Sequence, residues 1–184
     1  MARLPYLEPS DLAPENRDLL ARNINLYREM VHSPEGTRSF LHLAKYIRYH
    51  GRLDPRLREM AILQVGYITR SPYEYSHHIK IGREFGVSDD DIRAIVEETN
   101  NRPTNLAPLA KTVLRAAREM TVQMTLSDET FAALKQGLDN DQLVDLVMII
   151  SFYTGVVRLL AALQIDVEEE YEQYLKEFPL PKAG

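Results

Sequence analysis

Apolar residues recur along this chain at a spacing of three to four, which places them on one face of a helix. No segment alternates apolar and polar residues with the period of two that a half-buried strand shows. Proline, glycine and short polar residues separate the helical segments, as expected at helix ends. The pattern therefore predicts an all-α fold, with helices over about 14–32, 34–49, 55–68, 73–85, 89–98, 109–124, 128–136, 140–163 and 167–178.

Local capping signals mark several of these helix starts. Asp54 precedes Pro55, which is the order of an N-cap residue followed by proline in the first helical position. Ser88 precedes three aspartates, whose charges suit the positive end of a helix. In the helix that begins at Pro55, Ile62 and Leu63 widen the apolar stripe. We expect other helices to cover that one on more than one side.

Two helical segments share a weak internal similarity. Five residues of the first match five of the second at a constant offset of 86, and this pattern leaves a duplication and a chance match equally open. The matched residues are Leu57, Glu59, Ile62, Leu63 and Tyr67 with Leu143, Asp145, Met148, Ile149 and Tyr153.

Length and composition bound the type of protein. The 184 residues, of which 45% are hydrophobic, suffice for one core, so we expect a single domain over 1–184. The net charge of −5 argues against nucleic acid and anionic membranes as partners. The longest uncharged run, 146–157, is shorter than the roughly 20 residues of a membrane span. With no targeting signal in the first residues, these features predict a soluble, cytoplasmic protein.

The chain contains no cysteine. This absence excludes disulfides, thiolate zinc sites, iron–sulfur clusters held by cysteine, and cysteine-based peroxidases or proteases. Any catalytic chemistry must therefore come from carboxylates, histidines, hydroxyls or arginines.

One stretch gathers such groups around a tight corner. Glu59 lies on the helix before Ser71-Pro72, and the next helix begins directly after it. Glu74 and His78 are four residues apart on that second helix and therefore share a face. Antiparallel packing across the corner predicts that Glu59, Glu74 and His78 converge on one partly buried pocket.

The spacing of these residues resembles that of the carboxymuconolactone decarboxylase family, which includes the alkylhydroperoxidase D group. Redox members of that family show Glu, eleven residues, Cys, two residues, Cys, three residues and His. This chain keeps the spacing with Glu59, Ser71, Glu74 and His78, so both cysteines are replaced. The run Tyr-Glu-Tyr-Ser-His-His at 73–78 resembles a branch without cysteine. The resemblance covers about 37–125.

The resemblance implies packed helical hairpins of the alkylhydroperoxidase D-like type, assembled as homotrimers or homohexamers. It implies a pocket where the two motif helices meet, with Glu59 and His78 handling protons. It does not carry over a thiol peroxidase activity, because Ser71 and Glu74 cannot form a disulfide. No cofactor is implied by this route.

The site residues suit proton transfer. A carboxylate beside a histidine raises the basicity of the ring, and two neighbouring carboxylates push one pKa upward. We predict Glu59, Glu74 and His78 as catalytic residues of a cofactor-free lyase or isomerase that acts on a small carboxylated lactone or related acid. The predicted substrate-binding residues are Tyr73, Ser71 and His77, and Arg58 and Arg70 are candidates to hold a substrate carboxylate.

Other interpretations remain open at this level. Glu59 can simply pair with Arg56 on its own helix, and Glu74 with His78 can be an ordinary helix-surface pair. The protein can then be a non-catalytic ligand-binding or stress-linked family member. A single metal ion on Glu59, Glu74 and a histidine is a further alternative. A di-iron site is another, because the spacing Glu-x-x-His occurs at 74–77 and again at 29–32.

Overall fold

The computed structural model describes residues 2–181, and these residues form helices and connecting segments without a strand. The predicted all-α fold is therefore confirmed. The α-helices are α1 (Asn25–Met30), α2 (Pro34–Tyr49), α3 (Pro55–Ile68), α4 (Pro72–Glu84), α5 (Asp89–Thr99), α6 (Pro108–Gln123), α7 (Asp128–Gly137), α8 (Asn140–Leu163) and α9 (Glu172–Glu177), and three 3-10 helices span Pro9–Asp11, Pro14–Leu20 and Glu169–Tyr171.

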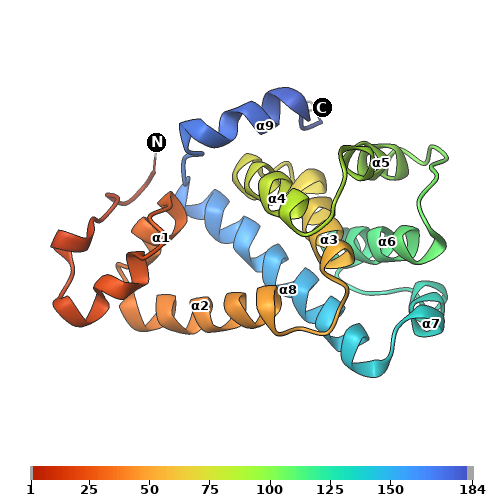
Figure 1. The fold of residues 1–184 in the computed structure, drawn as a ribbon, viewed down its shortest axis with the longest axis horizontal. Helices are drawn as coiled ribbons and strands as arrows, with labels where there is room; N and C mark the ends of the chain where they lie inside the picture. The colour runs from red at the N-terminus through yellow and green to blue at the C-terminus, as the bar shows by residue number, and fades with distance from the viewer. Residues whose placement is uncertain (1, 182–184) are drawn as a thin grey trace.

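Helix α3 is the centre of the packing. It contacts α4, α5, α6 and α8, and Figure 1 shows it surrounded by them. The residues from Met60 to Val65 have no exposed surface, apolar and polar alike. The widened apolar stripe of this helix thus matches its covering on several sides, as the sequence predicts.

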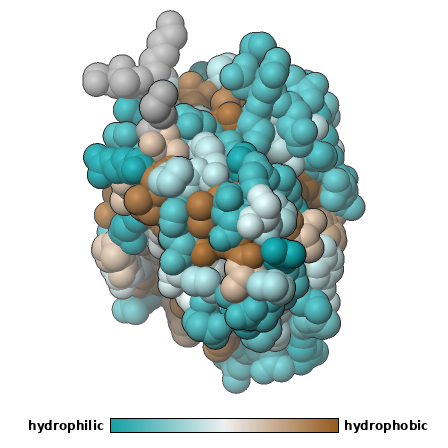
Figure 2. Space-filling model, turned by 90° about the vertical axis from the view of Figure 1, so that its left-hand side faces the viewer, coloured by the Kyte–Doolittle hydropathy of each residue, from teal (hydrophilic) through white to brown (hydrophobic). Residues whose placement is uncertain are grey.

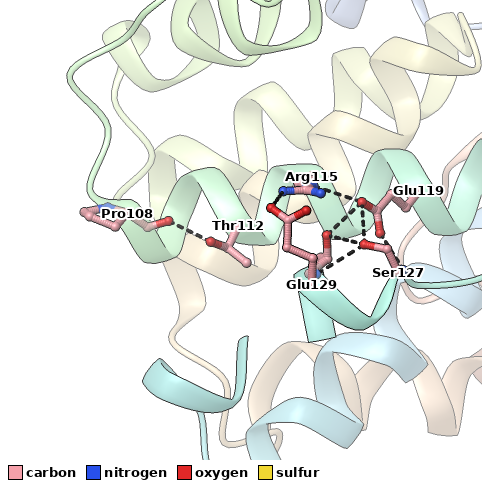
Figure 3. A network of polar contacts seen from close by, with 7 residues as sticks. Pro108, Thr112, Arg115, Glu119, Ser127 and Glu129 are labelled. Carbon is pink, nitrogen blue, oxygen red and sulfur yellow. Dashed lines mark hydrogen bonds and ion pairs between the residues drawn. The ribbon is translucent and has the colours of Figure 1, made fainter. Parts of the chain in front are cut away.

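The capping signals act as predicted. The Asp54 side chain accepts a hydrogen bond from Leu57 N, and Ser88 accepts one from Asp91 N. At the start of α7, Ser127 belongs to the polar network of Figure 3, in which Glu119 of α6 accepts bonds from Arg115 and from Ser127 N. Burial would raise the pKa of Glu119, but these bonds lower it to about 2. The network fixes the turn between α6 and α7.

The corner between α3 and α4 brings the two helices into close contact. Ser71 N donates to Gly66 O at 2.9 Å, which closes the turn. A Cβ atom on Gly66 would lie 3.1 Å from Tyr75 N and 3.2 Å from its Cα, so only glycine fits beside the α4 backbone without a shift. This close approach sets the antiparallel pair that carries the candidate site.

The prediction of one continuous helix over 14–32 is wrong. A 3-10 helix ends at Leu20, Ile24 has an extended backbone, and α1 begins at Asn25. The reason is tertiary: Asn25 N donates to Glu168 Oε1 at 2.7 Å, and its side chain donates to Asp166 O. The C-terminal segment thereby holds the start of a new helix. That segment is itself less helical than predicted, since only 169–177 is helical, in two short pieces.

Helix α8 is the one helix of the described chain that is long and apolar enough to cross a membrane by length and composition. Its most apolar window is 44% buried, and the helix packs against α3 and α6, as a core helix does. The two segments of the internal similarity form α3 and the first half of α8. Val157, which corresponds to the corner residue Ser71, lies inside α8, so the similarity does not extend to the corner.

The outer surface is mostly polar where the N-terminal segment covers it. Figure 2 shows this face as largely hydrophilic, with small separate hydrophobic patches. The exposed large apolar side chains among the described residues are Leu4, Tyr46, Tyr49, Val122, Met124, Phe131 and Val144.

Candidate active site

The imidazole of His78 lies between two buried carboxylates. Its Nδ1 is 2.7 Å from Glu59 Oε2, across the interface of α3 and α4. Its Nε2 is 2.9 Å from Glu74 Oε1, one turn earlier on its own helix. The three side chains are almost wholly inside the protein, with relative exposures of 1% for Glu59, 3% for Glu74 and 4% for His78. His78 thus lies within 3 Å of both carboxylates, as the spacing predicts, although the three side chains do not all line one pocket.

The two contacts of His78 differ in geometry. The contact with Glu59 is a hydrogen bond, whereas Glu74 Oε1 is close to the ring but out of line for one. Glu74 Oε1 is therefore a buried carboxylate oxygen without a hydrogen bond among the described residues. Such an atom is costly to keep in a structure and calls for an explanation by function.

Mutual charge decides the protonation of this set. Burial would lower the pKa of His78, but the nearby carboxylates of Glu74 and Glu59 outweigh it and raise that pKa above its usual value. Burial would likewise raise the pKa of Glu59, but His78 and Arg58 outweigh it and lower that pKa. The arrangement thus holds a charged imidazolium beside an ionised Glu59.

Arg58 is the next charged residue of this buried set, and its guanidinium group is used for contacts within the protein. Its Nε donates to Glu59 Oε1 at 2.9 Å, its Nη1 donates to Arg48 O at 3.0 Å, and its guanidinium lies over Phe85. The alternative in which Glu59 pairs with Arg56 is wrong, because Arg56 binds Asp91 instead. Because Arg58 pairs with Glu59, its guanidinium group does not serve to hold a substrate carboxylate.

A small cavity of about 40 Å³ opens beside Glu74 and His78. Glu59 is not part of its wall, so it acts on the cavity only through His78. The Tyr153 ring, from α8, packs edge-on against His78 at a centroid distance of 5.0 Å. Burial, followed by the charges of Glu74 and Glu59, raises the pKa of Tyr153 well above its usual value.

An adjoining cavity of about 160 Å³ shares part of this wall, including Arg22 and Arg48. Lys45 lines the adjoining cavity as well. None of these three cations forms an ion pair with a carboxylate of the described residues. In a chain of net charge −5, this unpaired basic cluster is a local exception and attracts anions toward the cavity.

His77 faces the same small cavity but belongs to a separate cluster. Its ring is stacked between Tyr73 and Tyr171, with centroid distances of 4.1 and 3.6 Å. Its Nε2 lies 2.8 Å from Glu168 Oε2. Glu168 Oε1 accepts bonds from Asn25 N at 2.7 Å and from the Tyr73 hydroxyl at 3.0 Å. Burial lowers the pKa of His77 despite the neighbouring carboxylate.

We expect Glu168→Gln to reduce the free energy of unfolding by about 1–3 kcal/mol, because it weakens several partly buried hydrogen bonds to one carboxylate. Urea unfolding at neutral pH measures this effect. Glu169→Gln is the matched control, since Glu169 is the exposed neighbour. Equal stability of the two variants would contradict a fastening role for Glu168.

Ser71 lies apart from this cavity. It is the N-cap residue of α4, although its side chain makes no capping bond. It lines a different and larger cavity together with Arg70, whereas Tyr73 borders both. The predicted substrate-binding residues Tyr73, Ser71 and His77 are thus divided between two cavities.

Sequence reasoning missed several residues around the site. Arg48 and Arg22 come from segments that precede the motif, and Tyr153 and Glu168 come from segments that follow it. Only Tyr153 had a signal, through its correspondence with Tyr67 in the internal similarity. Isolated arginines and glutamates on helices carry no pattern that distinguishes them from surface residues.

The possible metal ligands are dispersed. The described residues contain no group of three or more His, Asp or Glu side chains placed to hold a metal ion. At the second Glu-x-x-His match, Glu29 accepts a bond from Leu4 N, and His32 Nε2 contacts Pro5 O. The two matches therefore lie in separate clusters of the described chain and give no support to a shared di-iron site.

The fold matches several solved structures over nearly the whole chain. One is an alkylhydroperoxidase AhpD core, an uncharacterized peroxidase-related protein from Ralstonia eutropha JMP134, with a TM-score of 0.79, 18% identity and coverage of 92% of this chain and 94% of that one. Another is an uncharacterized peroxidase-related protein from Silicibacter sp. TM1040, with a TM-score of 0.73, 16% identity and 92% coverage of both chains. The debrominase Bmp8, as a variant in complex with 2,3,4-tribromopyrrole, matches with a TM-score of 0.78 and 18% identity, over 97% of this chain and 100% of that chain.

These likenesses define the class of the fold, which is that of the alkylhydroperoxidase D-like helical proteins. The sequence model of the carboxymuconolactone decarboxylase family matches residues 34–119, which include both motif helices. Residues 34–119 are thus similar to this family, and the chain lacks cysteine. No curated protein matches the sequence.

Proposed function

We propose that this protein is a cofactor-free lyase or isomerase that transfers a proton on a small carboxylated lactone or a related acid. The observation that carries the proposal is the buried set Glu59–His78–Glu74, in which one carboxylate oxygen on a cavity wall lacks a hydrogen bond. Buried acid–base groups with shifted pKa values in a cavity are typical of catalytic sites.

Each group has a distinct role in this proposal. Glu59, which does not reach the cavity, positions His78 and keeps it protonated. His78 and Glu74, which line the cavity, exchange the proton with the substrate. Arg48 and Arg22 attract and orient a substrate carboxylate.

In a decarboxylation, the bond between the substrate carbon and its carboxylate breaks, and carbon dioxide leaves. The electron pair of that bond moves into the conjugated lactone. A proton from the His78–Glu74 pair then forms the new bond to carbon, and solvent restores the proton to the pair. The reaction needs no oxidant or reductant. In an isomerisation, the same pair removes the proton from one carbon and returns it to another.

The test is direct incubation of the purified protein with carboxymuconolactone in deuterated water, followed by NMR. We expect loss of carbon dioxide, a shift of the double bond, and incorporation of one deuterium at the carbon of the conjugated system that receives the electron pair. Other carboxylated lactones and unsaturated acids, screened in the same way for exchange, extend the test to isomerisation. Absence of turnover and of exchange with every compound would overturn the proposal and favour the non-catalytic alternative.

We also propose that the protein is a homotrimer or homohexamer. The supporting features are the similarity to the carboxymuconolactone decarboxylase family over residues 34–119 and the exposed apolar side chains of Val122, Met124, Phe131 and Val144. Sedimentation at micromolar concentration should give a mass that is three or six times the 21.2 kDa of the chain. A sharp monomer peak would contradict this proposal.

A further inference from the structure

A second cavity, of about 450 Å³, lies on the far side of the first turn of α4 from the basic cluster. Its wall combines the corner between α3 and α4, Thr121 near the end of α6, and the C-terminal half of α8 from Thr154 onward. The volume falls within the range of roughly 300–1,000 Å³ that small-molecule sites occupy. The proposed proton transfer does not use this cavity.

Most hydroxyl groups of the wall are already satisfied. Thr69, Thr121 and Thr154 donate to carbonyl groups of their own helices, at 2.7, 2.6 and 2.6 Å. These bonds leave Arg70, Arg158 and a few other groups as the polar atoms that a ligand can engage. The chemistry of the cavity is therefore set by its cations and not by its threonines.

Ser71 adds a buried donor at the same place. Its exposure is 9%, and its hydroxyl makes no hydrogen bond among the described residues although it lines the cavity. It caps α4, a helix of 13 residues whose N-terminal peptide groups present partial positive charge. Pro72 has no N–H, so the next free amides are those of Tyr73 and Glu74. A helix end of this kind favours a negatively charged ligand group.

Two guanidinium groups border the cavity without a carboxylate partner in the described chain. The only contact of the Arg158 side chain is with Met124 Sδ, at 3.6 Å. Arg70 has a φ of 53°, in the left-handed region that non-glycine residues rarely adopt. The bond from Arg70 N to Tyr67 O at 3.1 Å holds this conformation in the turn. This conformation is a common way to end a helix, since Thr69 is the C-cap of α3, and it turns Arg70 out of the helix at the corner.

The rest of the wall is hydrocarbon. It is formed by side chains of α8, of the segment after it and of the corner, namely Val157, Leu160, Ala161, Ile165 and Pro72. A ligand that fits this wall has an apolar body with a single negatively charged end.

We propose that this cavity binds a small monocarboxylic acid with a hydrocarbon body. The carboxylate lies against Arg70, Arg158 and Ser71, and the hydrocarbon lies along α8. Tyr73 separates this cavity from the acid–base cavity, since its residue borders both. Binding here is independent of turnover at His78.

The probe for this site is octanoate, titrated into the full chain by calorimetry, with octanol as the uncharged control of equal length. We expect the wild type to bind octanoate and not octanol. Because paired charges dominate such recognition, the double variant Arg70→Gln/Arg158→Gln should raise the Kd by about tenfold or more. Arg93→Gln/Arg102→Gln is the charge-matched control, since both arginines are exposed and lie outside the cavity.

A second pair of variants tests the position without changing charge. Ala161 and Ala162 are both exposed residues of α8, but only Ala161 lines the cavity. Ala161→Trp therefore places an indole in the cavity, whereas Ala162→Trp places one outside it. The chain has no tryptophan, so each variant also reports octanoate by fluorescence. We expect Ala161→Trp to abolish binding and Ala162→Trp to retain it, with melting curves confirming the fold of both.

Three results would overturn the proposal. The first is no binding of octanoate, hexanoate, decanoate or benzoate to the wild type at millimolar concentration. The second is equal affinity of the wild type and Arg70→Gln/Arg158→Gln. The third is dissociation of an oligomer by Ala161→Trp without any octanoate binding to the wild type, which would assign this face to a second copy of the chain.

Discussion

Replacing Glu59 by Gln is expected to lower the pKa of His78 and to reduce the free energy of unfolding by about 3–5 kcal/mol at neutral pH. Glu59 is buried against His78 Nδ1 at 2.7 Å and against Arg58 Nε at 2.9 Å. The neutral amide leaves both cations without their shared anion inside the protein. The titration of the His78 ring by NMR and urea unfolding measure the two effects.

The pH dependence of the pair follows from the directions of the two shifts. The folded pKa of His78 is raised, so its contribution is complete below its unfolded value of about 6.5 and is lost as the pH rises through the folded pKa. The folded pKa of Glu59 is lowered, so its contribution is present above about 4.3 and is lost as the pH falls through the folded pKa. The difference in the free energy of unfolding between the wild type and Glu59→Gln should therefore be largest between about pH 4.3 and 6.5.

Glu84→Gln is the matched control for this experiment, because Glu84 is an exposed glutamate on α4. It should leave both the His78 titration and the unfolding curve unchanged. The ring of His77, which contacts Glu168 and not Glu59, is an internal reference within each spectrum. An unchanged His78 titration in Glu59→Gln would show that the pair does not control the protonation of His78.

Glu74→Gln is expected to lower kcat by about 10²–10⁴-fold on any substrate that the wild type turns over. The variant keeps the size of the side chain but removes the carboxylate that exchanges a proton at the cavity wall. KM should change little if Arg48 and Arg22 supply the binding of the substrate carboxylate. Steady-state kinetics with carboxymuconolactone, or with an acid found by deuterium exchange, separates the two parameters.

Two further variants make this second prediction specific. Arg48→Gln should raise KM more than it lowers kcat, because its proposed role is to hold the substrate. Glu84→Gln should match the wild type in both parameters. Retention of full kcat by Glu74→Gln would remove Glu74 from the proton-transfer step, whatever the state of the fold.

Much of the fold could be predicted because its signals are local. Helices α3 and α6 begin within one residue of the predicted positions, since a proline lies in the first turn of each. Asp54 and Ser88 cap their helices through side chains that reach only three residues along the chain. The spacing of Glu74 and His78 placed them on one face for the same reason.

The candidate site was predictable only in part. The corner at Ser71 and the positions of Glu59 and His78 were sufficient to predict their meeting, because two adjacent antiparallel helices leave few alternatives. The choice of Arg58 over Arg56 as the partner of Glu59 was not predictable. Arg58 directly precedes Glu59 and Arg56 lies three residues before it, so both are near Glu59 on the helix, and only the position of Asp91 on α5 draws Arg56 away.

The sequence by itself determined an all-α chain without thiol chemistry, the ends of most helices, and the three residues of the acid–base set. The tertiary structure decided what surrounds that set. Arg48 reaches the cavity from α2 and Tyr153 from α8, while Glu168 fastens His77 and breaks the predicted helix at Asn25. These contacts join segments tens of residues apart, and their energies depend on burial and charge that no local pattern encodes.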